Sequence, residues 1–248
     1  MAAESLELVV VGKLSLATDG EALKKCIEKE RKALLLFREG IYADSGMLST
    51  WRDGDDEGCY NWKGIHCSNQ TGHIQILDLH ASGPLYMAGT INITLLSDLH
   101  DLKHLDLCHN CFYPCDIPQS IESLTNLRYL SLTYSNFVGS IPKELGKLSN
   151  LQYIDMSFSD LEGAIPWQIK NLSKLQYLDL GENNLVGVIP YQLGNLSMLH
   201  TLQLGYNMNL TVANRKNSDA EWISKLSLLT NLDLSYVSDV DVAVVHSW

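Results

Sequence analysis

Four residues in the segment LCHNCFYPC, Cys108, His109, Cys111 and Cys115, are of the types that bind zinc through thiolate and imidazole groups. Their spacing matches no complete zinc signature, and disulfides are the commoner use of cysteines in secreted chains. We therefore expect no metal here, and either a Cys111–Cys115 disulfide or a bond from this group to Cys26. The six cysteines allow many pairings, so the sequence leaves the choice open.

Paired carboxylates are the next candidates for chemistry. Asp155 and Asp179 stand at the same position of neighbouring repeats, where a glycosidase pair could be imagined. Their recurrence at one repeat position explains them better than catalysis does. The chain has no G-x-S-x-G, H-E-x-x-H, P-loop or protein-kinase motif. We expect no enzymatic activity and no cofactor.

Composition narrows the class of protein further. The 248 residues are 46% hydrophobic, which is enough for one sizeable core. The net charge of −11 disfavours nucleic acid and anionic membranes as partners, because both are themselves anionic. The chain has no run of about 18 or more apolar residues, so we expect no transmembrane segment in it.

One pattern organises most of the chain. Its frame is L-x-x-L-x-L-x-x-N-x-L-x-G-x-I-P, with serine in place of asparagine at Ser135 and Ser159. A repeat of this length indicates a solenoid, because a single copy cannot bury its own apolar face. Copies open every 24 residues at Leu127, Leu151, Leu175 and Leu199.

Each copy predicts a short strand followed by a turn. In LQYLDL, apolar residues alternate with polar ones, which places Leu178 and Leu180 inward and Tyr177 and Asp179 outward. A buried asparagine can then bond the backbone where the chain leaves the strand. Proline after the isoleucine ends regular pairing and starts the return path. The candidate buried asparagines are Asn110, Asn183 and Asn207.

The frame resembles leucine-rich repeats, and its trailing G-x-I-P resembles the plant extracellular subclass. The resemblance implies an α/β solenoid shaped like a horseshoe, with a parallel β-sheet on its concave face. About six and a half repeats cover residues 73–248, with an irregular first repeat, an insertion at Cys115 in the second, and a helix-like segment at 220–229 in the sixth. No closing cap follows, so we interpret the chain as part of a longer one or as a truncated product.

Residues 26–72 resemble the N-terminal cap of plant leucine-rich-repeat receptors. The segment KERKALLLFRE, residues 29–39, predicts an amphipathic helix. A cap must cover the apolar end of the first repeat, and Trp51, Trp62 and Ile65 are the candidates. Related receptors commonly have two adjacent cysteines where this chain has Cys59 and then a tyrosine, so either Cys26 or Cys67 loses its usual partner. We favour a Cys59–Cys67 disulfide.

Secretion is indicated by a set of N-x-[ST] sequons, which we expect to carry glycans. Residues 1–25 are either a degenerate signal peptide or a poorly ordered tail, since acidic residues occupy the place of a basic n-region. We expect the protein outside the cell, secreted or on the extracellular face of the plasma membrane in the apoplast. The sequons are Asn69, Asn92, Asn171, Asn195 and Asn209.

Recognition residues are expected on the concave face, where outward side chains of successive strands form columns. Tyrosine in the first of these columns and aspartate in the third are frequent in this repeat class. The second column, just after the strand, varies more between repeats, so we rank its residues higher as candidate ligand contacts. The first column is His104, Tyr129, Tyr153, Tyr177 and Thr201. The second column is His109, Tyr134, Phe158, Glu182, Tyr206 and Tyr236. The third column is Asp106, Ser131, Asp155, Asp179, Gln203 and Asp233.

Three functional interpretations follow from the resemblance. The first is a ligand-recognition module of a plant receptor-like protein, which binds a peptide, protein or microbial molecule in defence or development and signals with a membrane co-receptor kinase. The second is a soluble inhibitor of a cell-wall hydrolase, similar to polygalacturonase inhibitors. The third is a truncated product without function. We favour the first.

Overall fold

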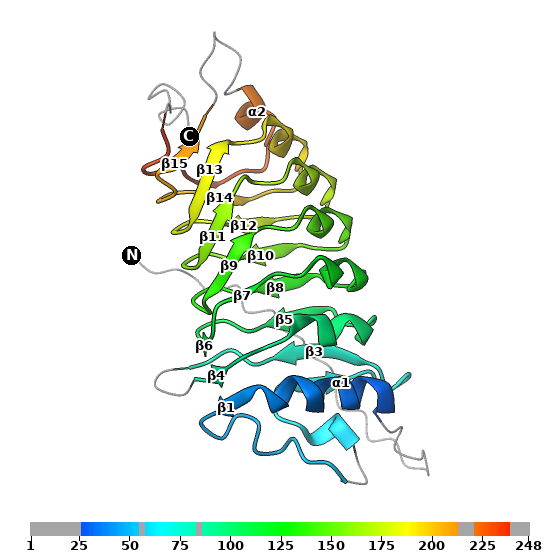
Figure 1. Cartoon of the computed structure of the whole chain (residues 1–248). Helices are drawn as coiled ribbons and strands as arrows, with labels where there is room; N and C mark the ends of the chain where they lie inside the picture. Colours follow the sequence, from blue (N-terminus) through cyan, green and yellow to red (C-terminus); the bar gives the residue numbers. More distant parts are fainter. Residues whose placement is uncertain (1–25, 55–57, 83–85, 213–220, 239–248) are drawn as a thin grey trace.

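The computed structural model describes residues 26–54, 58–82, 86–212 and 221–238, so the predicted signal peptide or tail at 1–25 lies outside it. The described chain coils into a stack of similar turns, with helix α1 (Glu28–Glu39) at one end and α2 (Glu221–Ser224) at the other (Figure 1). One apolar core runs through the stack from Cys26 to Val237. The predicted α/β solenoid is confirmed.

An eight-stranded sheet forms one side of the stack. Its strands are parallel except β2, which pairs antiparallel with β3 at the N-terminal edge. Equivalent residues of neighbouring repeats face each other, as Tyr153 faces Tyr177. From one edge to the other the strands are β2 (Ile65–Cys67), β3 (Ile74–Asp78), β5 (His104–Asp106), β8 (Tyr129–Ser131), β10 (Tyr153–Asp155), β12 (Tyr177–Asp179), β14 (Thr201–Gln203) and β16 (Asn231–Asp233).

The inward and outward assignments for these strands are confirmed. Leu175, Leu178 and Leu180 are fully buried, whereas Tyr177 and Asp179 face outward and are partly exposed. We call the outward-facing surface of the eight-stranded sheet the sheet face; it is the surface that the sequence predicted as concave. A short strand in each turn suffices because the leucines of successive turns stack directly on one another.

A second parallel sheet, which the sequence interpretation missed, is built by the segments that lead into G-x-I-P. The glycines of this motif lie at or near the ends of the strands and have positive φ angles, +74° at Gly139 and +76° at Gly163. Glycine adopts such angles without strain. The strands are β7 (Cys115–Asp116), β9 (Phe137–Ser140), β11 (Asp160–Gly163), β13 (Asn184–Val188) and β15 (Asn209–Thr211). A smaller sheet near the cap joins β1 (Ile41–Ala43), β4 (Ala88–Gly89) and β6 (Cys111–Phe112).

Short 3-10 helices form the return path. Those of the regular turns begin directly after a proline that lacks an N–H, as expected, and neighbouring helices pack side by side. These helices are η2 (Ile93–Asp98), η3 (Gln119–Ser123), η4 (Lys143–Lys147), η5 (Trp167–Asn171) and η6 (Tyr191–Asn195), and a further 3-10 helix, η1 (Gly58–Asn61), lies in the cap. The helix expected at 220–229 is described only as α2, because the backbone after Ser224 changes to i,i+3 hydrogen bonds such as Leu226 N to Ile223 O.

The cap covers the first turn as predicted. Helix α1 packs against η2 and buries Leu34 and Phe37. The rings of Trp51 and Trp62 stack with their centroids 5.2 Å apart, and both side chains are buried. The carboxylate of Glu30 is buried as well, and it accepts a hydrogen bond from the Ile74 N–H at 2.8 Å. This bond joins the cap helix to the first strand of the repeats.

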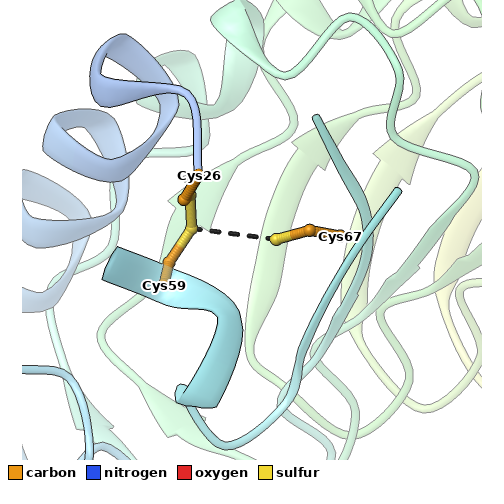
Figure 2. A group of neighbouring side chains, drawn as sticks. All are labelled: Cys26, Cys59 and Cys67. Carbon is orange, nitrogen blue, oxygen red and sulfur yellow. Dashed lines mark hydrogen bonds between the residues drawn. A yellow bond between two sulfur atoms is a disulfide. The ribbon is translucent and has the colours of Figure 1, made fainter. Parts of the chain in front are cut away.

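The disulfide assignment from sequence was wrong. Cys26 is bonded to Cys59, and their Cα atoms are 5.6 Å apart (Figure 2). Cys67 is a free thiol whose Sγ lies 3.9 Å from that of Cys59. Cys26 takes this partner because it directly precedes α1, which lies over η1, whereas Cys67 points at the pair from β2 (Figure 2).

The expected Cys111–Cys115 disulfide is also absent from the described residues, where both cysteines are free. Cys111 lies on β6 of the small sheet and is exposed. Cys115 begins β7 of the five-stranded sheet and is partly buried. The chain passes from one sheet to the other between them, so the two side chains do not meet.

Buried asparagines hold the turns in register, as predicted. The Asn183 amide donates to the carbonyl oxygens of Met156, Leu180 and Gly181 at 2.8 to 3.1 Å, and its Oδ1 accepts from the Leu161 N–H at 3.0 Å. Asn207 and Asn110 repeat this arrangement. One side chain therefore satisfies backbone groups of two successive turns.

The observed pairing predicts unequal effects for two cysteine substitutions. Cys26→Ser opens a bridge between residues 33 apart in sequence, and we expect it to lower the free energy of unfolding by about 3 kcal/mol. Cys67→Ser removes no bond and should change it by less than about 1 kcal/mol. Chemical denaturation of both variants measures this. A large loss for Cys67→Ser with none for Cys26→Ser would instead support a Cys59–Cys67 bond.

The asparagine ladder predicts a second contrast. Asn183→Ala leaves several buried backbone groups unpaired and should destabilise the fold by about 2–4 kcal/mol. Ser159→Ala, at the equivalent position of the preceding repeat, removes only a 3.4 Å bond to the Ser157 carbonyl and should cost less than about 1 kcal/mol. Thermal and denaturant unfolding compare the two, and equal losses would contradict the role given to the asparagine.

Candidate ligand-recognition surface

The register of the eight-stranded sheet assembles the three predicted columns. Tyr129, Tyr153 and Tyr177 are directly paired across β8, β10 and β12. His104 and Thr201 extend this first column at its two ends. Asp155 and Asp179 are paired in the third column in the same way. These side chains share one surface because the repeat places each of them at the same point of its turn.

The rings of the first column stack on one another. Neighbouring centroids are 4.1 Å apart for His104 and Tyr129, and 4.4 Å apart for the next two pairs along the column. The Tyr177 hydroxyl donates to Asp179 at 3.2 Å. Burial is the main cause of a raised pKa for Tyr129, Tyr153 and Tyr177, so these hydroxyls stay protonated at neutral pH. The column thus presents stacked rings whose hydroxyl groups donate to the aspartates of the third column.

The third column is acidic. Asp78 of β3 continues it at the N-terminal end, so five of the seven turns from β3 to β16 carry an aspartate at this position. Burial raises the pKa of Asp179 to about 6, and the charge of nearby Asp155 adds to the shift. The Gly181 N–H, which donates to Asp179 at 2.9 Å, acts in the opposite direction. The aspartates are Asp78, Asp106, Asp155, Asp179 and Asp233.

The second column lies just after the strands and has an unusual backbone. All six of its residues have positive φ, between +50° at Phe158 and +61° at Tyr236. This left-handed region costs bulky residues about 1 kcal/mol or more, and glycine or asparagine would relieve that cost. Hydrogen bonds between turns hold the backbone there, such as Phe158 N to Gly181 O at 3.1 Å and Tyr206 N to Ser235 O at 2.7 Å.

Aromatic side chains dominate the second column even though the backbone disfavours them. Tyr134, Phe158 and Tyr206 are between 43% and 46% exposed, which is high for rings of this size. Tyr134 stacks on Phe158 with centroids 4.2 Å apart, and Tyr206 lies 4.7 Å from Tyr236. Glu182 interrupts the two aromatic groups. The column therefore offers two exposed aromatic patches with a carboxylate between them.

All five sequon asparagines are exposed. Asn171 and Asn195 end η5 and η6 on the return path, away from the sheet face. Asn92 precedes η2, and its side chain accepts from the Thr94 N–H at 3.0 Å. Asn69 lies in the turn between β2 and β3, and Asn209 begins β15.

Potential metal ligands meet in places that the sequence did not indicate. Within the described residues, no three of Cys108, His109, Cys111 and Cys115 bring their ligand atoms within 4.8 Å of one another. Two other sets do: the three cysteines Cys26, Cys59 and Cys67, and the set Asp78, His104 and Asp106 on the sheet face. The second set was missed because its members lie on two strands, and only the register brings them together.

Comparison with known families agrees with this architecture. Residues 75–246 match the family described as leucine-rich repeat region, and residues 27–68 match the leucine rich repeat N-terminal domain. The chain belongs to the leucine-rich repeat family. The 24-residue frame, the stacked parallel strands and the asparagine ladder are the features of this chain that correspond to it.

Among curated proteins, the leucine-rich repeat chain is similar to plant receptor-like proteins. It is 46% identical to receptor-like protein EIX2 of Solanum lycopersicum over 125 residues, and 40% identical to receptor-like protein EIX1 of the same plant over 127 residues. Each match covers 47% of this chain and 12% of the relative. The chain thus spans a small part of the length of the receptors that it matches.

Solved structures of plant receptor ectodomains share the fold. The complex of PEPR1 with AtPEP1 gives a TM-score of 0.74 at 26% identity, covering 84% of this chain and 28% of that one. The Arabidopsis receptor kinase HAESA with the peptide hormone IDA and the co-receptor SERK1 gives 0.73 at 27% identity, covering 85% and 34%. No helix in the described part of this leucine-rich repeat chain is long and apolar enough to cross a membrane.

The raised pKa of Asp179 predicts a pH-dependent effect of Asp179→Asn. Between about pH 4 and pH 6 the Asp179 carboxyl is protonated to a greater extent in the folded chain than in the unfolded chain. The free energy of unfolding of the wild type therefore falls as the pH rises through that window. The asparagine amide carries no charge, so the variant does not lose this stability. We expect the loss in the wild type to be about 1 kcal/mol after solvent screening. Denaturant unfolding at pH 4 and pH 7 should show a higher free energy of unfolding for the variant, relative to wild type, at pH 7 than at pH 4. A difference independent of pH would contradict the assignment.

Proposed function

We propose that this chain is a ligand-recognition region of a plant extracellular receptor-like protein and that its sheet face binds a peptide or protein ligand. The second column carries the proposal. Its exposed aromatic side chains occupy backbone positions that disfavour them, and strained positions are found where a structure supports binding. Nothing in the packing of the fold requires Phe158 or Tyr206 to be aromatic, since both rings point out of the core.

Rigidity makes these side chains effective anchors. From His109 to Tyr206, the backbone N–H of every second-column residue donates to a carbonyl of the next turn, and the rings of Tyr134 and Phe158 stack on each other. These side chains therefore lose little conformational entropy when a ligand binds, and each ring offers a large contact area. Tyr134 with Phe158 and Tyr206 with Tyr236 form the two proposed anchor patches. Tyr129, Tyr153 and Tyr177 contribute hydroxyl groups beside them.

Charge narrows the ligand class. Five aspartates along the third column and Glu182 between the aromatic patches make the sheet face acidic along its length. The whole chain carries a net charge of −11. A ligand with lysine or arginine side chains spaced along an extended backbone complements this surface, and the attraction also speeds its association.

Similar proteins support this role. PEPR1 was solved with AtPEP1, and HAESA was solved with the peptide hormone IDA and the co-receptor SERK1. By analogy we propose a membrane co-receptor kinase as a second partner and an extracellular location for this chain. The exposed positions of the five sequon asparagines are compatible with glycans, because Asn171 and Asn195 lie on the return path rather than on the sheet face.

A peptide selection tests the proposed function. The probe is a random library of 15-residue peptides displayed on phage and selected on the full chain purified from a secreting host. We expect the enriched peptides to contain lysine or arginine. Phe158→Ala and Glu182→Lys should weaken their binding at least about tenfold, because each removes a central contact.

The matched control is Tyr191→Ala. Tyr191 is 68% exposed and begins η6 on the return path, so its loss should leave peptide binding unchanged. Circular dichroism and thermal unfolding establish that all variants are folded. Peptides that bind the Phe158 and Glu182 variants as well as wild type, or that lose binding to the Tyr191 variant, would contradict recognition by the sheet face.

A further inference from the structure

The N-terminal end of the sheet face gathers histidines and aspartates from three neighbouring strands. β5 contributes His104 and Asp106, and β3 contributes Asp78, with His80 just after it. His66 comes from β2, which pairs with β3 at the edge of the sheet. His66, Asp78 and His80 also line one open hollow of about 280 Å³. Imidazole and carboxylate groups are therefore concentrated on one patch beside open space.

Three of these residues have the geometry of a metal site. The ligand atoms of Asp78, His104 and Asp106 all lie within 4.8 Å of one another. Zinc bonds of about 2.0–2.1 Å in a tetrahedron place ligand atoms about 3.3 Å apart, so modest side-chain rotations close the site. The backbone needs no change, because Asp78 and Asp106 are already paired across β3 and β5.

Asp106 is a buried carboxylate that lacks a cationic partner. It is 7% exposed, and no ion pair among the described residues includes it. Its hydrogen bonds come from the Cys108 N–H at 3.0 Å and the Tyr129 hydroxyl at 3.4 Å. Burying a carboxylate next to that of Asp78 is costly unless positive charge offsets it. A bound divalent cation would supply that charge.

The remaining groups are prepared for coordination. The His104 ring is held in place by stacking on Tyr129, with the two ring centroids 4.1 Å apart. His80 Nδ1 lies 2.6 Å from Asp78 Oδ1. The hydrogen bonds that Asp78 accepts within the described chain fall on Oδ1, so Oδ2 is left for a metal. Such carboxylate–histidine contacts orient metal ligands in known sites.

We propose that Asp78, His104 and Asp106 bind a divalent transition-metal ion, with zinc as the best match and His80 orienting Asp78. A nitrogen ligand beside two carboxylates selects zinc over calcium and magnesium, which take oxygen ligands. Three protein ligands leave the fourth position of a tetrahedral zinc ion free for water or for a carboxylate or imidazole of a bound partner. The site shares Asp78 and Asp106 with the acidic third column but contains no residue of the aromatic anchor patches, so zinc binding and peptide binding are tested separately.

Zinc titration of the full, chelator-treated chain by isothermal calorimetry tests the site, with ZnCl2, CaCl2 and MgCl2 as probes. We expect one saturable zinc per chain and no comparable calcium or magnesium binding. His104→Phe keeps the ring over Tyr129 but removes both nitrogens, and Asp106→Asn keeps the shape but removes the charge. Each should weaken zinc binding at least about tenfold.

The matched control is His109→Phe. His109 belongs to the same repeat as His104 but lies outside the cluster, and it stacks on Tyr134 of the next repeat. It should bind zinc as wild type does. Thermal unfolding shows whether Asp106→Asn is folded, and His104→Phe decides the matter if it is not. Absence of saturable zinc binding, full binding by His104→Phe, or equal binding of calcium would each overturn the proposal.

Discussion

The one-to-one stacking of turns is the constraint on which the rest of the structure depends. No turn can bury its leucines alone, so each strand must lie in register with the next, and the asparagine ladder fixes that register by bonding carbonyl oxygens of two turns at once. The cap completes the same arrangement. Trp51 and Trp62 replace a preceding turn, and β2 closes the sheet edge with an antiparallel strand.

Register also separates structural from functional positions. A leucine and an aspartate one residue apart in the strand face the core and the solvent, so the surface can change without altering the core. The backbone of the second column is held in the left-handed region by bonds between turns, whatever side chain it carries. Each aromatic residue there costs about 1 kcal/mol or more of stability and adds contact area, so the column favours binding at the expense of stability.

Periodicity predicted the features that every turn repeats, and missed those that depend on particular contacts between segments. The pattern within one repeat predicts that Leu178 points inward, that Tyr177 points outward and that Asn183 hydrogen-bonds to the backbone. The structure confirms all three predictions. The Cys26–Cys59 bond depends on where α1 lies over η1, which spacing along the chain does not encode. The second sheet and the Asp78, His104 and Asp106 cluster likewise arise only when turns stack. The three columns of outward side chains were predicted, but the positive φ of the second column was not, and the role of the columns in ligand recognition stays a prediction.

Site-specific photocross-linking tests most directly whether the second column is the recognition surface. The full chain would carry benzoylphenylalanine at position 158 or, as the comparison, at position 191, and would be irradiated in plant extracellular fluid. The proposed surface predicts a discrete peptide or protein adduct from position 158 that an excess of wild-type chain suppresses, and none from position 191. An adduct from position 191 alone, or the same adduct from both, would contradict it.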